Sequence, residues 1–131
     1  MILDYQNTFC SGQAVTTDAA SENTIDLGVG DIGKSQDQAP WVYVRVAEAF
    51  TNATSVAIQL QTDDNTSFSS AATLSSTTVL LAALTLNAEV LKMRLPIGCE
   101  RYVRLYFDVT GTTPDAGKFS AYLVEDVQAS F

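Results

Sequence analysis

The sequence predicts an all-β protein, a single-domain, jelly-roll-like antiparallel β-sandwich. Apolar and polar residues alternate in several short segments, which is the pattern of half-buried strands. Clusters of Gly, Pro, Asn and Asp separate these segments at regular spacing. The chain has 131 residues, of which 47% are hydrophobic, so it can form one domain with a sizeable core. We therefore assign residues 1–131 to a single domain with a short N-terminal arm, residues 1–12.

Four strands are expected in the first half of the chain, at residues 13–17, 24–27, 41–48 and 54–62. Their inward-facing apolar rows are Ile25 and Leu27; Val42, Val44 and Val46; and Val56, Ile58 and Leu60. Residues 28–40 contain three glycines and a proline and are expected to form a long surface loop. The Asp-Asp-Asn sequence at 63–65 predicts a turn, after which Phe68 returns to the core.

The second half begins with residues 69–78, which are rich in Ser, Thr and Ala and give no clear pattern. Residues 79–86 are apolar enough for a helix, but Thr85 and the neighbouring threonines suggest a strand or a loop, and we expect the strand. Further strands are expected at residues 89–95, 101–109 and 118–125, with a corner at 96–98 and a hairpin-like turn at 110–117. Their inward rows are Leu91, Met93 and Leu95; Val103, Leu105, Phe107 and Val109; and Phe119, Ala121 and Leu123.

The outward rows of two predicted strands contain aromatic residues and arginine instead of the usual Lys, Glu or Ser, and the outward row of a third contains Tyr122 together with Ser120. Their members are Trp41, Tyr43 and Arg45; Tyr102, Arg104 and Tyr106; and Tyr122. Tyr, Trp and Arg are enriched in protein contact surfaces, so these rows predict a subunit or partner interface. If the strands are neighbours, the rows form one platform. The alternatives are a second core layer under a loop or the opposing sheet, and a surface that stacks on sugars.

The charge excludes several classes of partner. Fifteen Asp and Glu residues against seven Lys and Arg residues give a net charge of −8, which disfavours nucleic acid and anionic membranes as partners.

The chain has no histidine, the commonest general base and a common zinc ligand, and no pair of its acidic residues can be named as a catalytic pair. We predict a protein that is not an enzyme, with no catalytic, cofactor-binding or metal-binding residues. No signal peptide or membrane span is recognisable, so we expect a protein that is made and used without export, or exported only by cell lysis.

Other motifs have simple structural explanations. Asp63, Asp64 and Asn65 could contribute to a calcium site, but a turn explains them as well. Cys99 would need an activating base to be a nucleophile, so a structural thiol is expected. Cys10 and Cys99 permit one disulfide, but two free, buried thiols are the expectation. The glycines of residues 28–33 lack the βαβ context of a phosphate-binding loop.

Nearly the whole chain resembles the Bbp16-type capsid cement (decoration) proteins of tailed bacteriophages. The order and spacing of several segments carry this resemblance: LDYQNTFCSGQAVT, AASENTIDLG, VAEAF, IQLQTDDNTSFSS, LPIGCERYVRLYF, DAGKF and AYLVEDVQ. The resemblance implies a non-enzymatic structural virion protein with a jelly-roll-like fold that binds the outer surface of an HK97-type capsid shell. The two cysteines are not positions associated with the family, and residues 79–86 are variable in it.

The same resemblance implies the partners. They are the phage major capsid protein, whose neighbouring copies the protein would bridge, and further copies of the protein itself, with a dimer favoured and a trimer possible. The protein would be made in the cytoplasm of the bacterial host, without a cofactor. The arm at residues 1–12 and the loop at 28–40 would add peripheral contacts. The alternative function is a carbohydrate-binding jelly-roll module on a phage surface, using the same aromatic residues.

Overall fold

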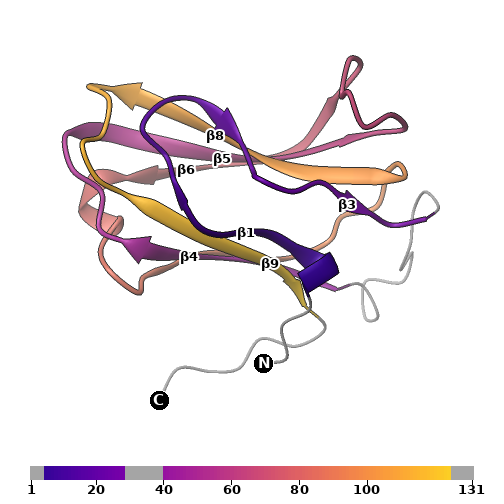
Figure 1. Cartoon of the computed structure of the whole chain (residues 1–131), viewed down its shortest axis with the longest axis horizontal. Helices are drawn as coiled ribbons and strands as arrows, with labels where there is room; N and C mark the ends of the chain where they lie inside the picture. Colours follow the sequence, from indigo (N-terminus) through magenta and orange to yellow (C-terminus); the bar gives the residue numbers. More distant parts are fainter. Residues whose placement is uncertain (1–4, 29–39, 125–131) are drawn as a thin grey trace.

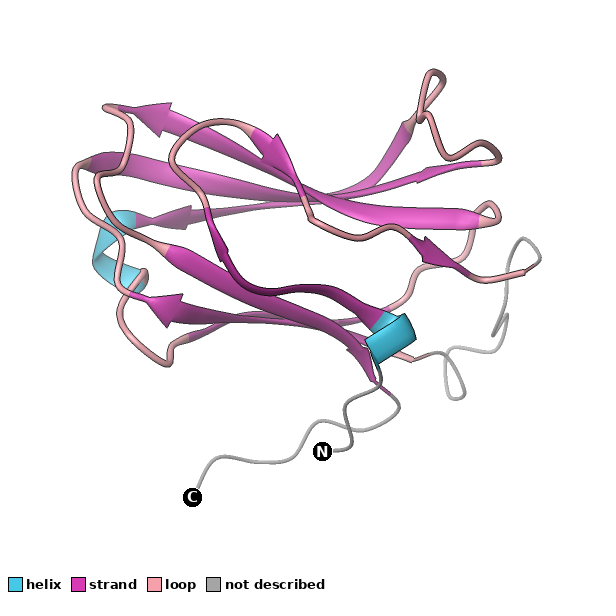
Figure 2. Ribbon diagram, viewed as in Figure 1, coloured by secondary structure: helices cyan, strands magenta, loops and turns pink. Residues whose placement is uncertain are grey.

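The computed structural model describes residues 5–28 and 40–124, and these form two antiparallel sheets packed face to face (Figure 1). The prediction of an all-β sandwich is confirmed. The strands are β1 (Thr8–Ala14), β2 (Ala19–Ala20), β3 (Ile25–Asp26), β4 (Trp41–Glu48), β5 (Ala53–Asp63), β6 (Ala72–Leu80), β7 (Glu89–Arg94), β8 (Tyr102–Gly111) and β9 (Lys118–Val124). Two short 3-10 helices, η1 (Tyr5–Asn7) and η2 (Leu81–Ala83), lie at opposite ends of the sandwich (Figure 2). No helix of the described residues is long and apolar enough to cross a membrane.

The strand order is that of a jelly roll. Sheet A has the order β1-β9-β4-β7, and sheet B has the order β2-β8-β5-β6, with β3 also paired to β8. If β2 and β3 are counted as one interrupted strand, each sheet contains four strands. Apart from the β2–β3 and β5–β6 connections, each link between consecutive strands crosses from one sheet to the other. Strands far apart in the sequence therefore pair, as β1 does with β9.

The core lies between the two sheets and is formed by the predicted inward rows. The rows of β4, β5 and β8 are almost entirely buried, namely Val42, Val44 and Val46; Val56, Ile58 and Leu60; and Val103, Leu105 and Phe107. Three aromatic rings link the sheets. Phe119 of β9 stacks on Phe107 of β8 at 4.9 Å between centroids and packs at a tilt against Phe50 at 4.7 Å. The alternation predicted for these strands is thus confirmed.

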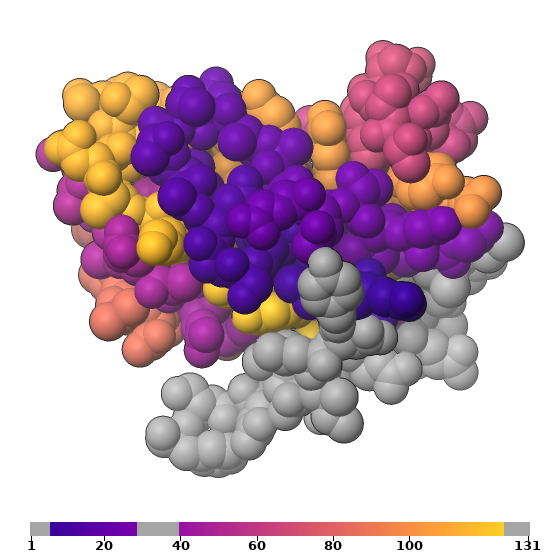
Figure 3. All heavy atoms as spheres, in the orientation of Figure 1, coloured from indigo at the N-terminus to yellow at the C-terminus, as the bar shows by residue number. Residues whose placement is uncertain are grey.

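The first strand differs from the prediction. It was expected at residues 13–17, but β1 covers Thr8–Ala14, so residues 8–12 of the predicted arm belong to sheet A. Its pairing with β9 has two register shifts, and Gly12 between them has a φ of +63°. Bulges add residues that break the alternation, which explains why the sequence pattern is not recognisable there. Figure 3 shows this N-terminal segment covering the near side of the sandwich.

The region around β6 also differs. A strand was expected at 79–86, but β6 ends at Leu80, η2 follows, and Leu84 is buried in the core. Within residues 5–28 and 40–124, β6 is an edge strand that pairs with β5 alone, and it is largely exposed. An exposed edge needs no apolar row, so Ser and Thr give little periodic signal.

The connection at residues 110–117 is not the hairpin-like turn that was expected, because β8 and β9 lie in different sheets. Gly117, with a φ of +146°, lies so close to the Phe50 ring that a Cβ atom would clash with it. The corner predicted at 96–98 also connects the two sheets, from β7 to β8. Most of the predicted loop at 28–40 and the first four residues of the predicted arm lie outside the described residues.

Candidate functional site

The structure separates the predicted interface residues into two groups. Trp41, Tyr43 and Arg45 lie on β4 and Tyr122 on β9, both in sheet A, whereas Tyr102, Arg104 and Tyr106 lie on β8 in sheet B. Both rows point away from the core, so they occupy opposite outer surfaces of the sandwich. A single platform required the strands to be neighbours, and β4 and β8 are not. That expectation is wrong, and we refer below to a sheet A face and a sheet B face.

On the sheet A face, the tyrosines form a small second hydrophobic cluster. Tyr43 lies directly opposite Tyr122 across the β4–β9 pair, and their exposed fractions are only 7% and 8%. Val124 is also buried in this cluster, and Trp41 packs against it. Burial, followed by the nearby Glu89 carboxylate, raises the pKa of Tyr43 above its usual range. For Tyr43 and Tyr122, the structure thus favours the second core layer over an exposed contact surface.

Cations surround this cluster. The Arg94 guanidinium lies 4.3 Å from the centroid of the Trp41 ring, and the Lys92 ammonium lies 5.2 Å from it. Arg45 is half-buried, and its Nε has no hydrogen-bond partner among the described residues. Two acidic residues lie on the same strands, Glu48 on β4 and Glu89 on β7. The Glu48 carboxylate lies 3.8 Å from the Lys118 ammonium. The sheet A face is therefore more basic than the acidic chain as a whole.

The sheet B face is more accessible, and its arginine is held in place. Tyr102, Arg104 and Tyr106 are all half-exposed. Arg104 donates from Nε to Oε1 of Gln61 at 2.9 Å, and its guanidinium lies 4.3 Å from the Phe68 ring centroid. These two contacts restrict the conformations of the Arg104 side chain.

Phe68 is a contributor that the sequence did not assign to this face. It was expected in the core, and it is buried, but it lies outside the main core cluster and packs against Arg104. Its φ of +52° is unusual for a non-glycine residue. The only sequence signal was an isolated aromatic residue within a run of Ser and Thr.

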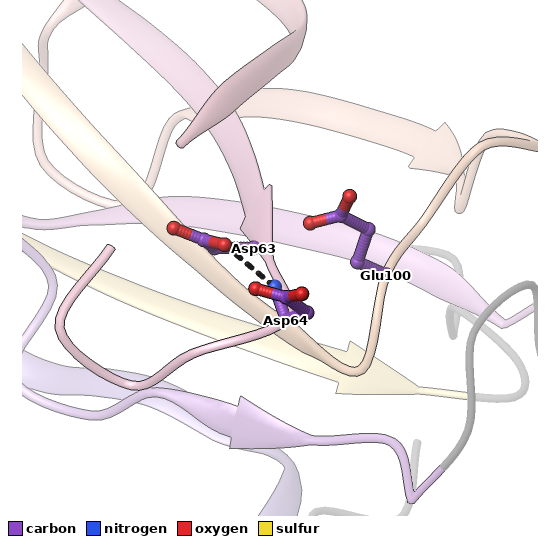
Figure 4. A group of neighbouring side chains, drawn as sticks. All are labelled: Asp63, Asp64 and Glu100. Atoms are coloured by element: carbon purple, nitrogen blue, oxygen red, sulfur yellow. Dashed lines mark hydrogen bonds between the residues drawn. The ribbon is translucent and has the colours of Figure 1, made fainter. Parts of the chain in front are cut away.

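An acidic group lies at one end of β5, where Asp63, Asp64 and Glu100 have carboxylate oxygens within 4.8 Å of one another (Figure 4). Such oxygens suit a hard cation such as calcium. Asp63, however, accepts hydrogen bonds from the backbone N–H of Ser70 at 2.9 Å and of Asp64 at 2.7 Å, and these bonds lower its pKa. The predicted turn is confirmed, and Asp63 organises it. Sequence reasoning missed Glu100 because it arrives from the distant β7–β8 corner.

A comparison with models of known protein families shows to which family the chain belongs. The family model named Bbp16 matches residues 9–123. The chain belongs to the Bbp16 family. The Bbp16 match extends from β1 into β9 and includes all seven predicted interface residues. The family name points to a bacteriophage protein. No curated protein matches the chain.

The two cysteines, both within the Bbp16 match, are buried and form no disulfide, as predicted. Burial raises the pKa of the Cys10 thiol to about 12, so very little thiolate forms at neutral pH. The Cys10 thiol donates to the carbonyl of Phe119 at 3.5 Å, and the Cys99 thiol to that of Pro96 at 3.2 Å. These contacts explain the cysteines as packing residues of the fold.

Proposed function

We propose that this protein is a capsid cement protein that binds the outer surface of an assembled HK97-type phage capsid and bridges neighbouring major capsid proteins. The observation that carries the proposal is the Bbp16 match across the entire sandwich. The net charge of −8 supports a position outside the shell, because packaged DNA would repel such a protein. It would be synthesised in the host cytoplasm and act without a cofactor.

The sheet B face is the proposed docking surface for the major capsid protein. Its Tyr102, Arg104 and Tyr106 side chains are half-exposed, whereas Tyr43 and Tyr122 of the sheet A face are buried. Partly exposed tyrosines around a fixed arginine match the composition of interface centres. The guanidinium has five N–H donors, and the bond to Gln61 uses only the one on Nε. The others suit carbonyl and carboxylate groups of the capsid surface.

The protein would stabilise the capsid because it would bind only to the assembled shell. A ligand that binds only the assembled shell stabilises that shell by mass action. Many copies act together on one particle, so each individual contact can be modest. A contact that spans two neighbouring capsid proteins must be broken before they separate, which would raise the temperature at which the particle opens.

Co-sedimentation with undecorated capsids tests the proposal. The wild-type protein should bind and raise the temperature at which particles release DNA, whereas the double variant Tyr102→Ala/Tyr106→Ala should remain in the supernatant. A matched control is Lys92→Ala/Trp41→Phe on the sheet A face, which should bind like the wild type. Circular dichroism would check that each variant is folded. Undiminished binding of the Tyr102→Ala/Tyr106→Ala variant would refute the docking surface, and failure of the wild type to bind would refute the cement function.

A carbohydrate-binding module is the second candidate. The sheet B face places Tyr102 and Tyr106 on the strand next to Gln59 and Gln61, a combination of rings and amides that also suits sugars. A glycan array and calorimetry with polysaccharides would separate the two. Saturable binding of a defined glycan that is lost in Tyr106→Ala, without capsid binding, would favour the module.

A further inference from the structure

Two arginines lie near the start of β8, and their guanidinium groups have different partners. Arg101 directly precedes β8 and donates twice to Asp26 of β3, from Nε to Oδ1 and from Nη2 to Oδ2, both at 2.9 Å. These hydrogen bonds lower the pKa of Asp26 and raise the pKa of Arg101. The positive charge of Arg101 is therefore already balanced within the protein.

Arg104, within β8, has no carboxylate partner among the described residues. Its Nε donates to the neutral amide oxygen Oε1 of Gln61 at 2.9 Å. In the described part of the chain, the terminal nitrogens Nη1 and Nη2 donate no hydrogen bond, and they are not among the buried atoms that lack a partner. They are therefore in contact with water. In a protein with a net charge of −8, Arg104 thus presents a positive charge to solvent.

Two aromatic rings lie against the Arg104 guanidinium. Its Cζ atom lies 4.3 Å from the centroid of the Phe68 ring and 5.9 Å from that of the Tyr106 ring. Tyr106 belongs to the same strand, whereas Phe68 comes from the connection between β5 and β6. With rings against its plane and a hydrogen bond on Nε, the group has its Nη1–Nη2 end left for a partner.

The β5–β6 connection holds Phe68 in place. Phe68 is only 7% exposed and has a left-handed φ of +52°, which a bulky residue keeps only where the surrounding structure holds it. The Phe68 N–H donates to the Asn65 carbonyl at 3.1 Å, and the Asp63 carboxylate accepts from the Ser70 N–H at 2.9 Å. Figure 3 shows this connection projecting from one end of the sandwich. A turn that is fixed in this way determines where the Phe68 ring, and with it Arg104, lies.

We propose that the Nη1–Nη2 end of Arg104 binds one carboxylate, from an Asp or Glu side chain of the major capsid protein, and that Phe68 is the residue that positions it. The inference rests on the proposed function, because the carboxylate belongs to the capsid. The two terminal nitrogens form a planar fork that matches the two oxygens of a carboxylate, whereas a backbone carbonyl offers only one oxygen. The charges are complementary, since no carboxylate among the described residues pairs with Arg104.

Equilibrium co-sedimentation with undecorated capsids tests the role of Arg104 with a matched pair of variants. Arg104→Lys and Arg101→Lys both keep the positive charge and remove the planar fork. Arg104→Lys should raise the dissociation constant about tenfold, because it loses the bidentate contact. Arg101→Lys should change it by less than about twofold, because its fork is occupied by Asp26 and the pair is exposed. Equal affinities of the two variants, with the wild type binding normally, would overturn the inference and leave the cement function intact.

Chemical modification of the capsid identifies the group that Arg104 contacts. Capsids whose carboxyl groups have been amidated with a carbodiimide and glycinamide should bind the wild type and Arg104→Lys equally weakly, because the carboxylate is gone. A tenfold difference that persists on amidated capsids would show that Arg104 contacts a carbonyl group, and would overturn the inference. Failure of the wild type to bind unmodified capsids would refute the cement function and the inference together.

Two substitutions of Phe68 test its positioning role. Phe68→Leu keeps an apolar side chain but removes the ring, and should raise the dissociation constant about threefold. Phe68→Tyr keeps the ring and should bind like the wild type. Added to Arg104→Lys, Phe68→Leu should weaken binding no further, which a general structural defect would not produce. Additive losses in the double variant, or wild-type binding by Phe68→Leu, would remove the positioning role.

Discussion

The two outer faces are built from similar residues but have different surroundings. On the sheet A face, Tyr43 and Tyr122 face each other across paired strands and are buried with Val124. On the sheet B face, Tyr102 and Tyr106 flank Arg104 on a single strand and remain half-exposed. The same residue types therefore stabilise the fold on one side and remain available for contact on the other.

This difference shows that the identity of a residue does not determine its role, because the neighbouring strands decide its exposure. Tyr43 and Tyr122 lie opposite each other on adjacent strands, where side chains on one face are close together. Tyr102 and Tyr106 lie on one strand, with Arg101 and Arg104 over their rings, and both tyrosines remain partly exposed. Each prediction below compares the two faces, in order of decreasing effect.

The largest expected effect is on stability, from truncating a tyrosine of the sheet A face. Tyr122→Ala should lower the free energy of unfolding by about 2–4 kcal/mol, because it leaves a cavity beside Tyr43. Tyr106→Ala should lower it by less than about 1 kcal/mol, because its ring is already half in water. Urea denaturation followed by fluorescence of the single tryptophan measures both. Equal losses for the two variants would remove the proposed distinction between the faces.

A smaller effect is expected from replacing the tryptophan of the sheet A face. Trp41→Leu removes the ring on which Arg94 and Lys92 lie, and should cost about 1–2 kcal/mol of unfolding free energy. Tyr102→Leu removes the ring beside Arg101 on the sheet B face and should cost about 0.5 kcal/mol or less. Because Trp41→Leu lacks the fluorescent reporter, circular dichroism in urea is the common measurement. A larger loss of unfolding free energy in Tyr102→Leu than in Trp41→Leu would contradict the view that the sheet A face contributes more to stability.

The smallest expected effect is a pH dependence that originates on the sheet A face. The pKa of Tyr43 is raised above its ordinary value of 10.0, chiefly by burial. Since its folded-state pKa exceeds the unfolded one, Tyr43 contributes stability that is complete below pH 10 and is lost as the pH rises through the folded-state value. Urea titrations from neutral to strongly alkaline pH should show this decline, and Tyr43→Phe should reduce it. An identical decline in Tyr43→Phe would assign it to other groups.

The parts of the fold that the sequence predicts well are its central strands. β4, β5, β8 and β9 have a neighbour on each side, so one face is buried and Val, Ile, Leu and Phe alternate clearly. β1 and β6 were misplaced because an edge strand can bulge or be composed of Ser and Thr without losing its pairing. The edge strand β7 was nevertheless predicted close to its observed bounds, so the local pattern fails at an edge only where bulges or Ser and Thr obscure it.

The candidate site was predictable residue by residue but not as an arrangement. Alternation identified the outward rows of β4 and β8 correctly, yet it does not reveal which connections cross between sheets. The corner at 96–98 and the turn at 110–117 both cross, and this places Arg104 and Trp41 on opposite surfaces. Phe68 and Glu100 reach their neighbours through distant segments, so spacing along the chain contains no signal for them.

Hydroxyl-radical footprinting of the tyrosines tests the central claim most directly, because it examines both faces in one experiment. In the free protein, Tyr102 and Tyr106 should be oxidised much faster than Tyr43 and Tyr122. On decorated capsids, Tyr102 and Tyr106 should become protected, while Tyr43 and Tyr122 remain as slow as before. Unchanged oxidation of Tyr102 and Tyr106 on the capsid, or fast oxidation of Tyr43 and Tyr122 in the free protein, would contradict the account.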